Sequence, residues 1–227
     1  MQVAIRHNPS FAVARVSLAP GEPAQVEAGA MAAMSPDMTV QAQLQGGLMK
    51  SLARGALGGE SLFITTYTAG PYGGWVDVAP NLPGDVVVLT ASPERSWNLS
   101  KGCWLTSEWS VSIDTKWGGF GNLIGGEGGF LMRATGHGQL LVSCFGALDV
   151  HRLGQGERLV LDTGHLVAYT DGIGVSTRRM GGSTMTALKS GEGLVFEFTG
   201  PGEVLGQSRN PAGLVSYLAA RGLGARS

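Results

Sequence analysis

The feature that most restricts the fold of this sequence is a glycine frame that occurs three times along the chain. Gly29, Gly102 and Gly164 each follow an aliphatic residue three positions earlier and precede two consecutive apolar residues at the second and third positions after them. Apolar residues also recur nine and eleven positions after each glycine, an alternation typical of a half-buried strand. The residues at these offsets are Val26, Leu99 and Leu161, then Met31, Trp104 and Leu166 with Ala32, Leu105 and Val167, and finally Met38, Val111 and Ile173 with Val40, Ile113 and Val175.

Three Gly-Glu steps also stand at equivalent places in the repeats, and apolar residues occupy the third and fourth positions after Glu60, Glu127 and Glu192. Two consecutive apolar residues indicate a strand that is buried on both faces. Because a catalytic loop is normally unique in its chain, the recurrence favours a turn that begins a strand. A ring of three glutamates around a cation is the alternative, but it would bring like charges together. The residues predicted to form structural turns are Gly59, Glu60, Gly126, Glu127, Gly191 and Glu192, together with Gly29, Gly102 and Gly164.

The repeated offsets divide the chain into three units, residues 12–85, 86–147 and 148–206, followed by a tail at 207–227. Short apolar stretches alternate with turns, and the 37 glycines are about twice the usual share for a chain of this length. Units of this size exceed ordinary solenoid periods, so we expect them to pack around an internal pseudo-threefold axis. The sequence therefore predicts one all-β domain over residues 1–227, a β-sandwich or barrel of three pseudo-symmetric repeats.

The tail is predicted to contain a short C-terminal helix. Pro211 suits the first helical position, and Leu214, Val215 and Leu218 follow helical spacing. We expect this helix to dock on the β domain.

Composition excludes several classes of protein. Hydrophobic residues make up 43% of the chain and charged residues 15%, which is unlike a disordered chain. Lys and Arg number 16 against 17 Asp and Glu, so no overall positive field attracts nucleic acid or anionic lipid. Cys103 and Cys144 are expected to be reduced structural residues. The first residues lack the apolar segment of a signal peptide, and no window is apolar enough for a membrane-spanning helix, which predicts a cytoplasmic protein.

Four stretches of the sequence carry a family resemblance: "GGLMKSLARGALGGESLFITTYTAG", "LPGDVVVL", "GFGNLIGGEGGFLMRATGHGQLLVSCFGAL" and "LDTGHLVAYTDGIGVS". Over about residues 3–206 the chain resembles the bacterial branch of the family of altered inheritance of mitochondria protein 24. The resemblance implies a fold related to that of the tryptophan RNA-binding attenuator protein, in three pseudo-symmetric units. It implies no catalytic residues. Eukaryotic relatives are mitochondrial, but this chain lacks an Arg/Ser-rich transit segment.

Motifs for catalysis or cofactor binding are not apparent. The histidines His7, His137, His151 and His165 form no His-x-His pair and have no adjacent acid at metal-ligand spacing. The stretch "GFGNLIGG" lacks the final glycine of a dinucleotide-binding loop and the Lys-Ser/Thr of a Walker loop. No G-x-S-x-G nucleophile elbow occurs. We therefore predict no catalytic, cofactor-binding or metal-binding residues, and no cofactor.

RNA binding is a possibility because the attenuator protein binds RNA. Basic residues occur here only as scattered pairs, such as Arg178 and Arg179, without the interleaved aromatic residues of a base-stacking surface. Four tryptophans, Trp97, Trp104, Trp109 and Trp117, cluster in the middle unit, and two of them fall at strand positions, where they are expected to fill the core. RNA binding is thus disfavoured but not excluded.

Apolar, glycine-rich insertions precede the Gly-Glu steps and carry the strongest signal for a partner. If the repeats are pseudo-symmetric, the insertions lie at one end of the barrel and form a low-charge apolar patch. The alternative is that each insertion folds back and caps the barrel. The candidate patch residues are Leu48, Met49, Leu52, Phe120, Leu123, Ile124 and Met185.

These observations lead to three functional hypotheses. The first is a non-enzymatic β scaffold whose insertions mediate self-assembly or attachment to a protein or a membrane. The second is a module that binds RNA or a small anionic ligand between repeats. The third is an enzyme of unrecognised type, which requires a unique polar cleft that breaks the repeat.

Overall fold

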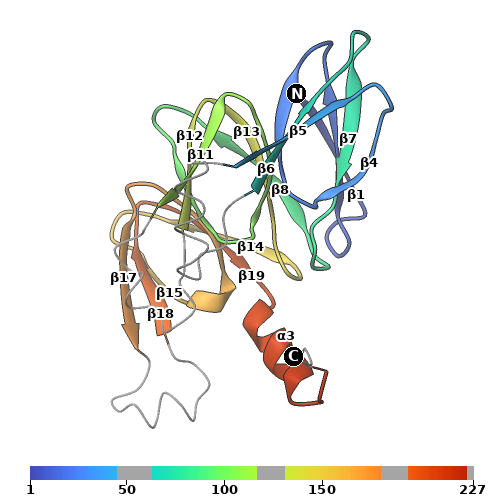
Figure 1. Ribbon diagram of the computed structural model, residues 1–227. Helices are drawn as coiled ribbons and strands as arrows, with labels where there is room; N and C mark the ends of the chain where they lie inside the picture. The colour runs from blue at the N-terminus through green and yellow to red at the C-terminus, as the bar shows by residue number, and fades with distance from the viewer. Residues whose placement is uncertain (45–62, 117–130, 180–193, 224–227) are drawn as a thin grey trace.

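The computed structural model describes residues 1–44, 63–116, 131–179 and 194–223 (Figure 1). The described residues form β-strands and one short C-terminal α-helix, so the prediction of an all-β fold with such a helix is confirmed. Strand β1 (Gln2–Arg6) comes first and is followed by three sets of six strands. The first set is β2 (Val13–Leu18), β3 (Pro23–Glu27), β4 (Met31–Met34), β5 (Thr39–Leu44), β6 (Phe63–Thr68) and β7 (Gly74–Val78). The second set is β8 (Val86–Ala91), β9 (Trp97–Ser100), β10 (Trp104–Glu108), β11 (Val111–Lys116), β12 (Leu131–Gly136) and β13 (Gly138–Ser143). The third set is β14 (Leu148–Leu153), β15 (Arg158–Asp162), β16 (Leu166–Thr170), β17 (Gly174–Arg179), β18 (Leu194–Thr199) and β19 (Gly202–Gln207).

Strand pairing is the same within each set. The sixth strand lies between the first and third strands, and the fifth lies between the second and fourth, with every pair antiparallel. The third strand has a one-residue register shift at its start in all three sets, between Met31 and Ala33, between Trp104 and Thr106, and between Leu166 and Ala168. The three sets can therefore be superposed residue by residue from their hydrogen-bonded ladders.

Two further strand pairs join consecutive sets. Strand β3 pairs with β10, and β9 pairs with β16, so the second strand of one set lies beside the third strand of the next. The described strands consequently form four sheets, with orders β1-β2-β7-β4, β5-β6-β3-β10-β13-β8, β11-β12-β9-β16-β19-β14 and β15-β18-β17. Each central sheet contains half of one set and half of the next.

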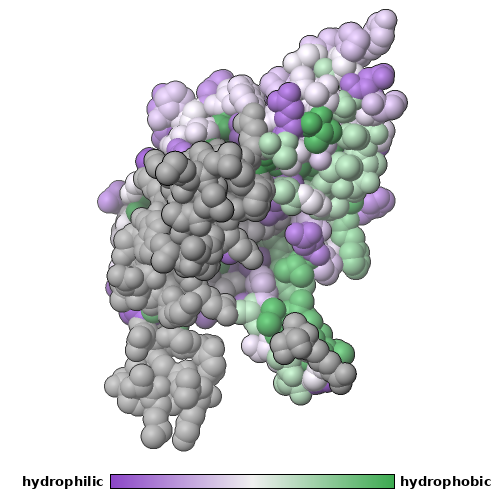
Figure 2. Space-filling model, viewed as in Figure 1, coloured by the Kyte–Doolittle hydropathy of each residue, from purple (hydrophilic) through white to green (hydrophobic). Residues whose placement is uncertain are grey.

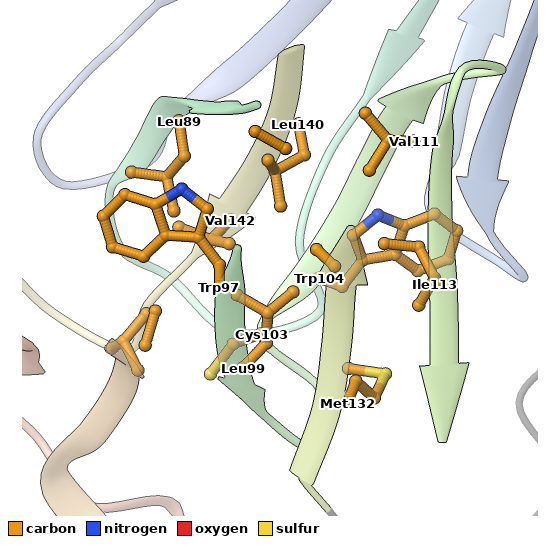
Figure 3. Packing of buried hydrophobic residues seen from close by; sticks show 14 of the residues in the cluster. Leu89, Trp97, Leu99, Cys103, Trp104, Val111, Ile113, Met132, Leu140 and Val142 are labelled. Carbon is orange, nitrogen blue, oxygen red and sulfur yellow. The ribbon is translucent and has the colours of Figure 1, made fainter. Parts of the chain in front are cut away.

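Buried side chains fill the three spaces between successive sheets. The second set, drawn in Figure 3, has Trp97 and Leu99 from one sheet packed with Trp104, Leu140 and Val142 from the other. Trp97 and Trp104 are 1% and 0% exposed, which confirms the expectation that two of the clustered tryptophans fill the core, whereas Trp109 is 53% exposed. The fold is a stack of sheets with one apolar layer at each sheet-to-sheet contact.

The C-terminal helix, α3 (Pro211–Ala219), is capped by Asn210, whose side chain accepts hydrogen bonds from the amides of Ala212 and Gly213. Pro211 occupies the first turn, where no amide donor is needed. None of its residues is fully buried, and Leu214 and Leu218 are half-buried. The helix therefore makes only limited apolar contact with the strands.

An ion cluster holds the first sheet together. The buried carboxylate of Asp77 on β7 accepts two hydrogen bonds from Arg15 on β2, at 2.8 and 2.9 Å, and one from Arg6 on β1, at 2.9 Å. The Arg15 guanidinium also lies 3.7 Å from the centre of the Trp75 ring. Hydrogen bonds from Arg15, and then from Arg6, lower the pKa of Asp77 below its ordinary value even though burial opposes the shift.

We expect Asp77→Asn to destabilise the protein by about 1–3 kcal/mol at neutral pH, because it removes charge-assisted hydrogen bonds between three strands. The lowered pKa means that the Asp77 carboxylate stabilises the fold above about pH 4, and that this contribution is lost as the pH falls through the lowered value. Urea unfolding between pH 2 and pH 7 measures both effects. Asp149→Asn at an exposed position is the control. Equal losses in the two variants contradict the assigned role of Asp77.

Glu27 is a half-buried carboxyl at the end of β3, where the first set joins the second. Burial raises the pKa of Glu27 to about 7. The folded protein thus holds the Glu27 proton more tightly than the unfolded chain does, so stability falls as the pH rises from the ordinary Glu range to about 7.

Glu27→Gln is expected to raise the free energy of unfolding at pH 8 by an amount on the order of 1–3 kcal/mol, and to leave stability at pH 4 nearly unchanged. The reason is that the neutral amide has no ionised form to bury. Thermal unfolding of both proteins at the two pH values tests this expectation, with Glu94→Gln at an exposed turn as the control. A lower melting temperature for Glu27→Gln at pH 8 would show that the ionised carboxylate is stabilising.

Candidate interaction surface

Some of the residues predicted from the sequence to form turns or an apolar patch lie outside the described residues, and others lie within them. The three Gly-Glu steps, Gly59-Glu60, Gly126-Glu127 and Gly191-Glu192, lie outside the described residues, as do the patch residues Leu48, Met49, Leu52, Phe120, Leu123, Ile124 and Met185. Gly29 and Gly102 lie in the turns before β4 and β10, with φ angles of 86° and 76° that favour glycine. Gly164 lies in a 3₁₀ turn (Thr163–His165), where the Asp162 side chain accepts a hydrogen bond from its amide.

The described residues offer no assembled metal centre. No group of three His, Cys, Asp or Glu side chains that could hold a metal ion occurs within them. His165 has a structural contact instead, because its Nδ1 lies 2.6 Å from the backbone oxygen of Gln207. In the same part of the chain, no helix has the length and apolar character that crossing a bilayer requires.

The two internal junctions between sets define what a complete contact looks like. At the first junction Thr106, Ser107 and Glu108 of β10 lie opposite Val26, Gln25 and Ala24 of β3. At the second, Ala168, Tyr169 and Thr170 of β16 lie opposite Leu99, Asn98 and Trp97 of β9. Both junctions therefore use the same three positions of the repeated pattern on each side.

A third pair of equivalent strands is open. Strand β4 occupies the position of β10 and β16, and β15 occupies the position of β3 and β9. No described strand pairs with the free side of either one, and they lie at opposite ends of the stack (Figure 1). We call these the β4 edge (Met31–Met34) and the β15 edge (Arg158–Asp162).

Exposure at the β4 edge contrasts with the two internal copies. Met31, Ala32 and Ala33 are exposed and Met34 is half-buried, with Met31 at 40%. The equivalent residues of β10 (Trp104, Leu105, Thr106, Ser107) and of β16 (Leu166, Val167, Ala168, Tyr169) are all buried. Figure 2 shows hydrophobic colouring on the side of the molecule that carries β4.

The β15 edge shows the same contrast on a smaller scale. Leu159 and Leu161 are half-buried and Val160 is 44% exposed. Leu159 is equivalent to Ala24 and Trp97, and Leu161 is equivalent to Val26 and Leu99. All four of these equivalent residues are exposed by 1% or less. Arg158 on β15 and Arg178 on β17 both form ion pairs with Glu197 on β18, the strand between them.

Charge distinguishes the open face of the first set from its internal equivalents. Asp77 stands where the second and third sets have Leu141 and Leu205, as the shared ladders show. Leu141 packs into the core of the first set, and Leu205 packs into the core of the second. The end of the stack thus carries the Asp77 ion cluster at a position that is apolar at both internal junctions.

Neither edge is recognisable as an interaction surface from the amino-acid sequence. The glycine frame aligns Met31 and Ala32 with Trp104 and Leu105, but all four are apolar, so the alignment gives no sign that the first pair is exposed. The available signal is residue size, because small or flexible side chains stand in the first copy where large ones stand in the others.

Comparison with known proteins places the chain in a family. The family model described as mitochondrial biogenesis AIM24 matches residues 3–209. An uncharacterised protein of Streptococcus pyogenes serotype M6 is 30% identical over 218 residues, covering 92% of this chain and 86% of that protein. The crystal structure of a Streptococcus pyogenes protein matches with a TM-score of 0.81 and 27% identity, covering 97% of this chain and 99% of that one. These matches confirm the resemblance seen in the sequence, and the chain belongs to the AIM24 family.

Proposed function

We propose that this protein is a non-enzymatic β scaffold whose function depends on self-association through an open sheet edge. The observation that carries the proposal is the exposure of β4, since the same strand position is buried in both other sets of the chain. Strands β10 and β16 are each covered on this side by a strand of the preceding set, whereas no described strand covers β4. The contact at β4 is therefore incomplete in the single chain.

The chemistry of the β4 edge supports association. An edge strand presents unpaired backbone N–H and C=O groups, and soluble proteins usually protect such edges with charged residues, proline or a bulge that faces outward. Strand β4 has the sequence Met-Ala-Ala-Met, with neither charge nor proline. Its register shift between Met31 and Ala33 also occurs in β10 and β16, and both of those strands pair with a neighbour on the equivalent side. The free side of β4 can therefore form a main-chain ladder with another strand at little desolvation cost.

The other hypotheses rest on sequence alone. Attachment to a membrane or a protein through the glycine-rich insertions concerns segments outside the described residues. Binding of RNA or an anionic ligand, and enzymatic activity, remain hypotheses from the sequence. Salt dependence distinguishes RNA binding from the proposed association, because RNA binding weakens steeply with ionic strength whereas apolar strand association does not.

The expected result is that the full-length protein elutes as a multiple of the single-chain mass, and that Ala33→Lys weakens this association by about tenfold or more, equivalent to roughly 1.4 kcal/mol. Lysine at this position places a charge on the pairing edge, while Ala33 is exposed in the single chain, so the fold should be retained. Size-exclusion chromatography with light scattering over a dilution series measures the change.

Val40→Lys is the matched control, because Val40 is also exposed, at 45%, and lies on β5, whose strand position is a sheet edge in all three sets. It should leave the assembly unchanged. A wild-type protein that remains a single chain at high concentration would overturn the proposal. If Ala33→Lys has no effect while Phe120→Ser with Leu123→Ser dissociates the assembly, then the insertions and not the β4 edge mediate association.

A further inference from the structure

The two open edges are complementary to each other. Within the chain, a strand in the position of β4 always pairs with a strand in the position of β15 from the preceding set. The first-strand position also differs between sets, because β2 pairs with β1 on its outer side whereas β8 and β14 have no partner there among the described strands. The outer edges of β5, β11 and β17 lack a described partner in all three sets, so their openness is a regular feature of the repeat.

We infer that copies of this chain join head to tail, with β4 of one copy antiparallel to β15 of the next. This inference rests on the proposed self-association and adds its geometry. The sheet formed across the contact has the order β17-β18-β15-β4-β7-β2-β1, and its strands from β17 to β2 repeat the order of both internal sheets. The occupant of the β4 edge is thus a second copy of the same chain.

The internal junctions also fix the register of this contact. Ala33 corresponds to Thr106 and Ala168, because all three follow the same register shift and lie opposite equivalent residues of the sixth strand. Leu161 corresponds to Val26 and Leu99 through the ladder with the fifth strand. Since Thr106 pairs with Val26 and Ala168 with Leu99, the contact pairs Ala33 with Leu161, Met34 with Val160 and Ser35 with Leu159.

Pairing within one chain is excluded by position, because the two edges belong to the first and last sheets of the stack (Figure 1). Pairing of β4 with β4 would be a symmetric contact for which the chain contains no example. A head-to-tail contact uses different surfaces on the two copies, so it builds a closed ring or an open chain according to the rotation between copies.

Side chains at the two edges suit this arrangement. Met31 and Val160, which are 40% and 44% exposed, are apolar residues that the added strand would cover. The Asp77 cluster with Arg6 and Arg15 replaces the leucine found at both internal junctions, so the contact between copies is more polar than those within the chain. We therefore expect an assembly that dissociates on dilution.

Cysteine cross-linking tests the register directly. Residues opposite each other on antiparallel strands have Cα atoms about 4.5–5.5 Å apart, which is within the range for a disulfide. The double variant Met34→Cys with Val160→Cys should form covalent dimers and higher multiples on mild oxidation by copper phenanthroline. The native thiols should not interfere, because Cys103 and Cys144 are buried, and burial raises the pKa of Cys103 to about 12.

Mixing the single variants tests whether the contact is head to tail. Met34→Cys alone and Val160→Cys alone should give no covalent product, whereas a mixture of the two should give dimers and nothing larger. Moving one cysteine out of register, as in Met34→Cys with Asp162→Cys, separates the Cα atoms to about 7–8 Å and should reduce the yield sharply. Near-ultraviolet circular dichroism checks that each variant retains the fold.

The outcomes separate this inference from the proposed function. A single chain at all concentrations overturns both. Association without cross-linking of the Met34/Val160 double variant, or with equal cross-linking of the out-of-register pair, overturns the head-to-tail register and leaves self-association standing. Covalent dimers of Met34→Cys alone identify a symmetric β4–β4 contact and also overturn the inference. Dimers only from the mixed singles, and multiples from the double variant, support it.

Discussion

Pairing between the second strand of one set and the third strand of the next is the interaction on which the rest of the structure depends. It joins half of each set to half of its neighbour in one continuous sheet, so no set completes its own core. Val86, Leu105 and Leu141 of the second set belong to the apolar cluster of the first. Because burial of such side chains is the main favourable term in folding, the stability of the first and second sets depends on the set that follows each of them.

Local strand structure could be predicted from the sequence because the repeat constrains it three times. The apolar alternation after each glycine gave Met38, Val111 and Ile173 as equivalent core residues, and all three are buried. The pairing between sets could not be predicted in the same way. Val26 and Thr106 lie far apart in sequence, and which strands meet depends on the packing of whole sheets and not on the local pattern.

The candidate surface was harder to predict because hydropathy does not distinguish a buried strand from an exposed one. Ala32 and Leu105 satisfy the same apolar position in the frame, yet the first is exposed and the second is fully buried. Asp77 presents the opposite difficulty. It interrupts an apolar strand, but its two arginine partners come from β1 and β2, so the ion cluster becomes evident only when the three strands lie side by side.

In the proposed assembly, the replacement of Leu141 and Leu205 by Asp77 accounts for the difference between the junctions within the chain and the junction at the β4 edge. Leu141 and Leu205 are never exposed to water in the folded chain, whereas the same face of the first set has to be compatible with water whenever copies are apart. Asp77, held by Arg6 and Arg15, satisfies that requirement through charge-assisted hydrogen bonds. The same cluster opposes tight association, because covering charged groups costs desolvation energy that apolar contact must offset. In the proposed head-to-tail assembly, the permanent junctions within the chain are apolar and the junction between copies is reversible, because the uncharged β4 strand favours pairing while the adjacent charges limit its strength.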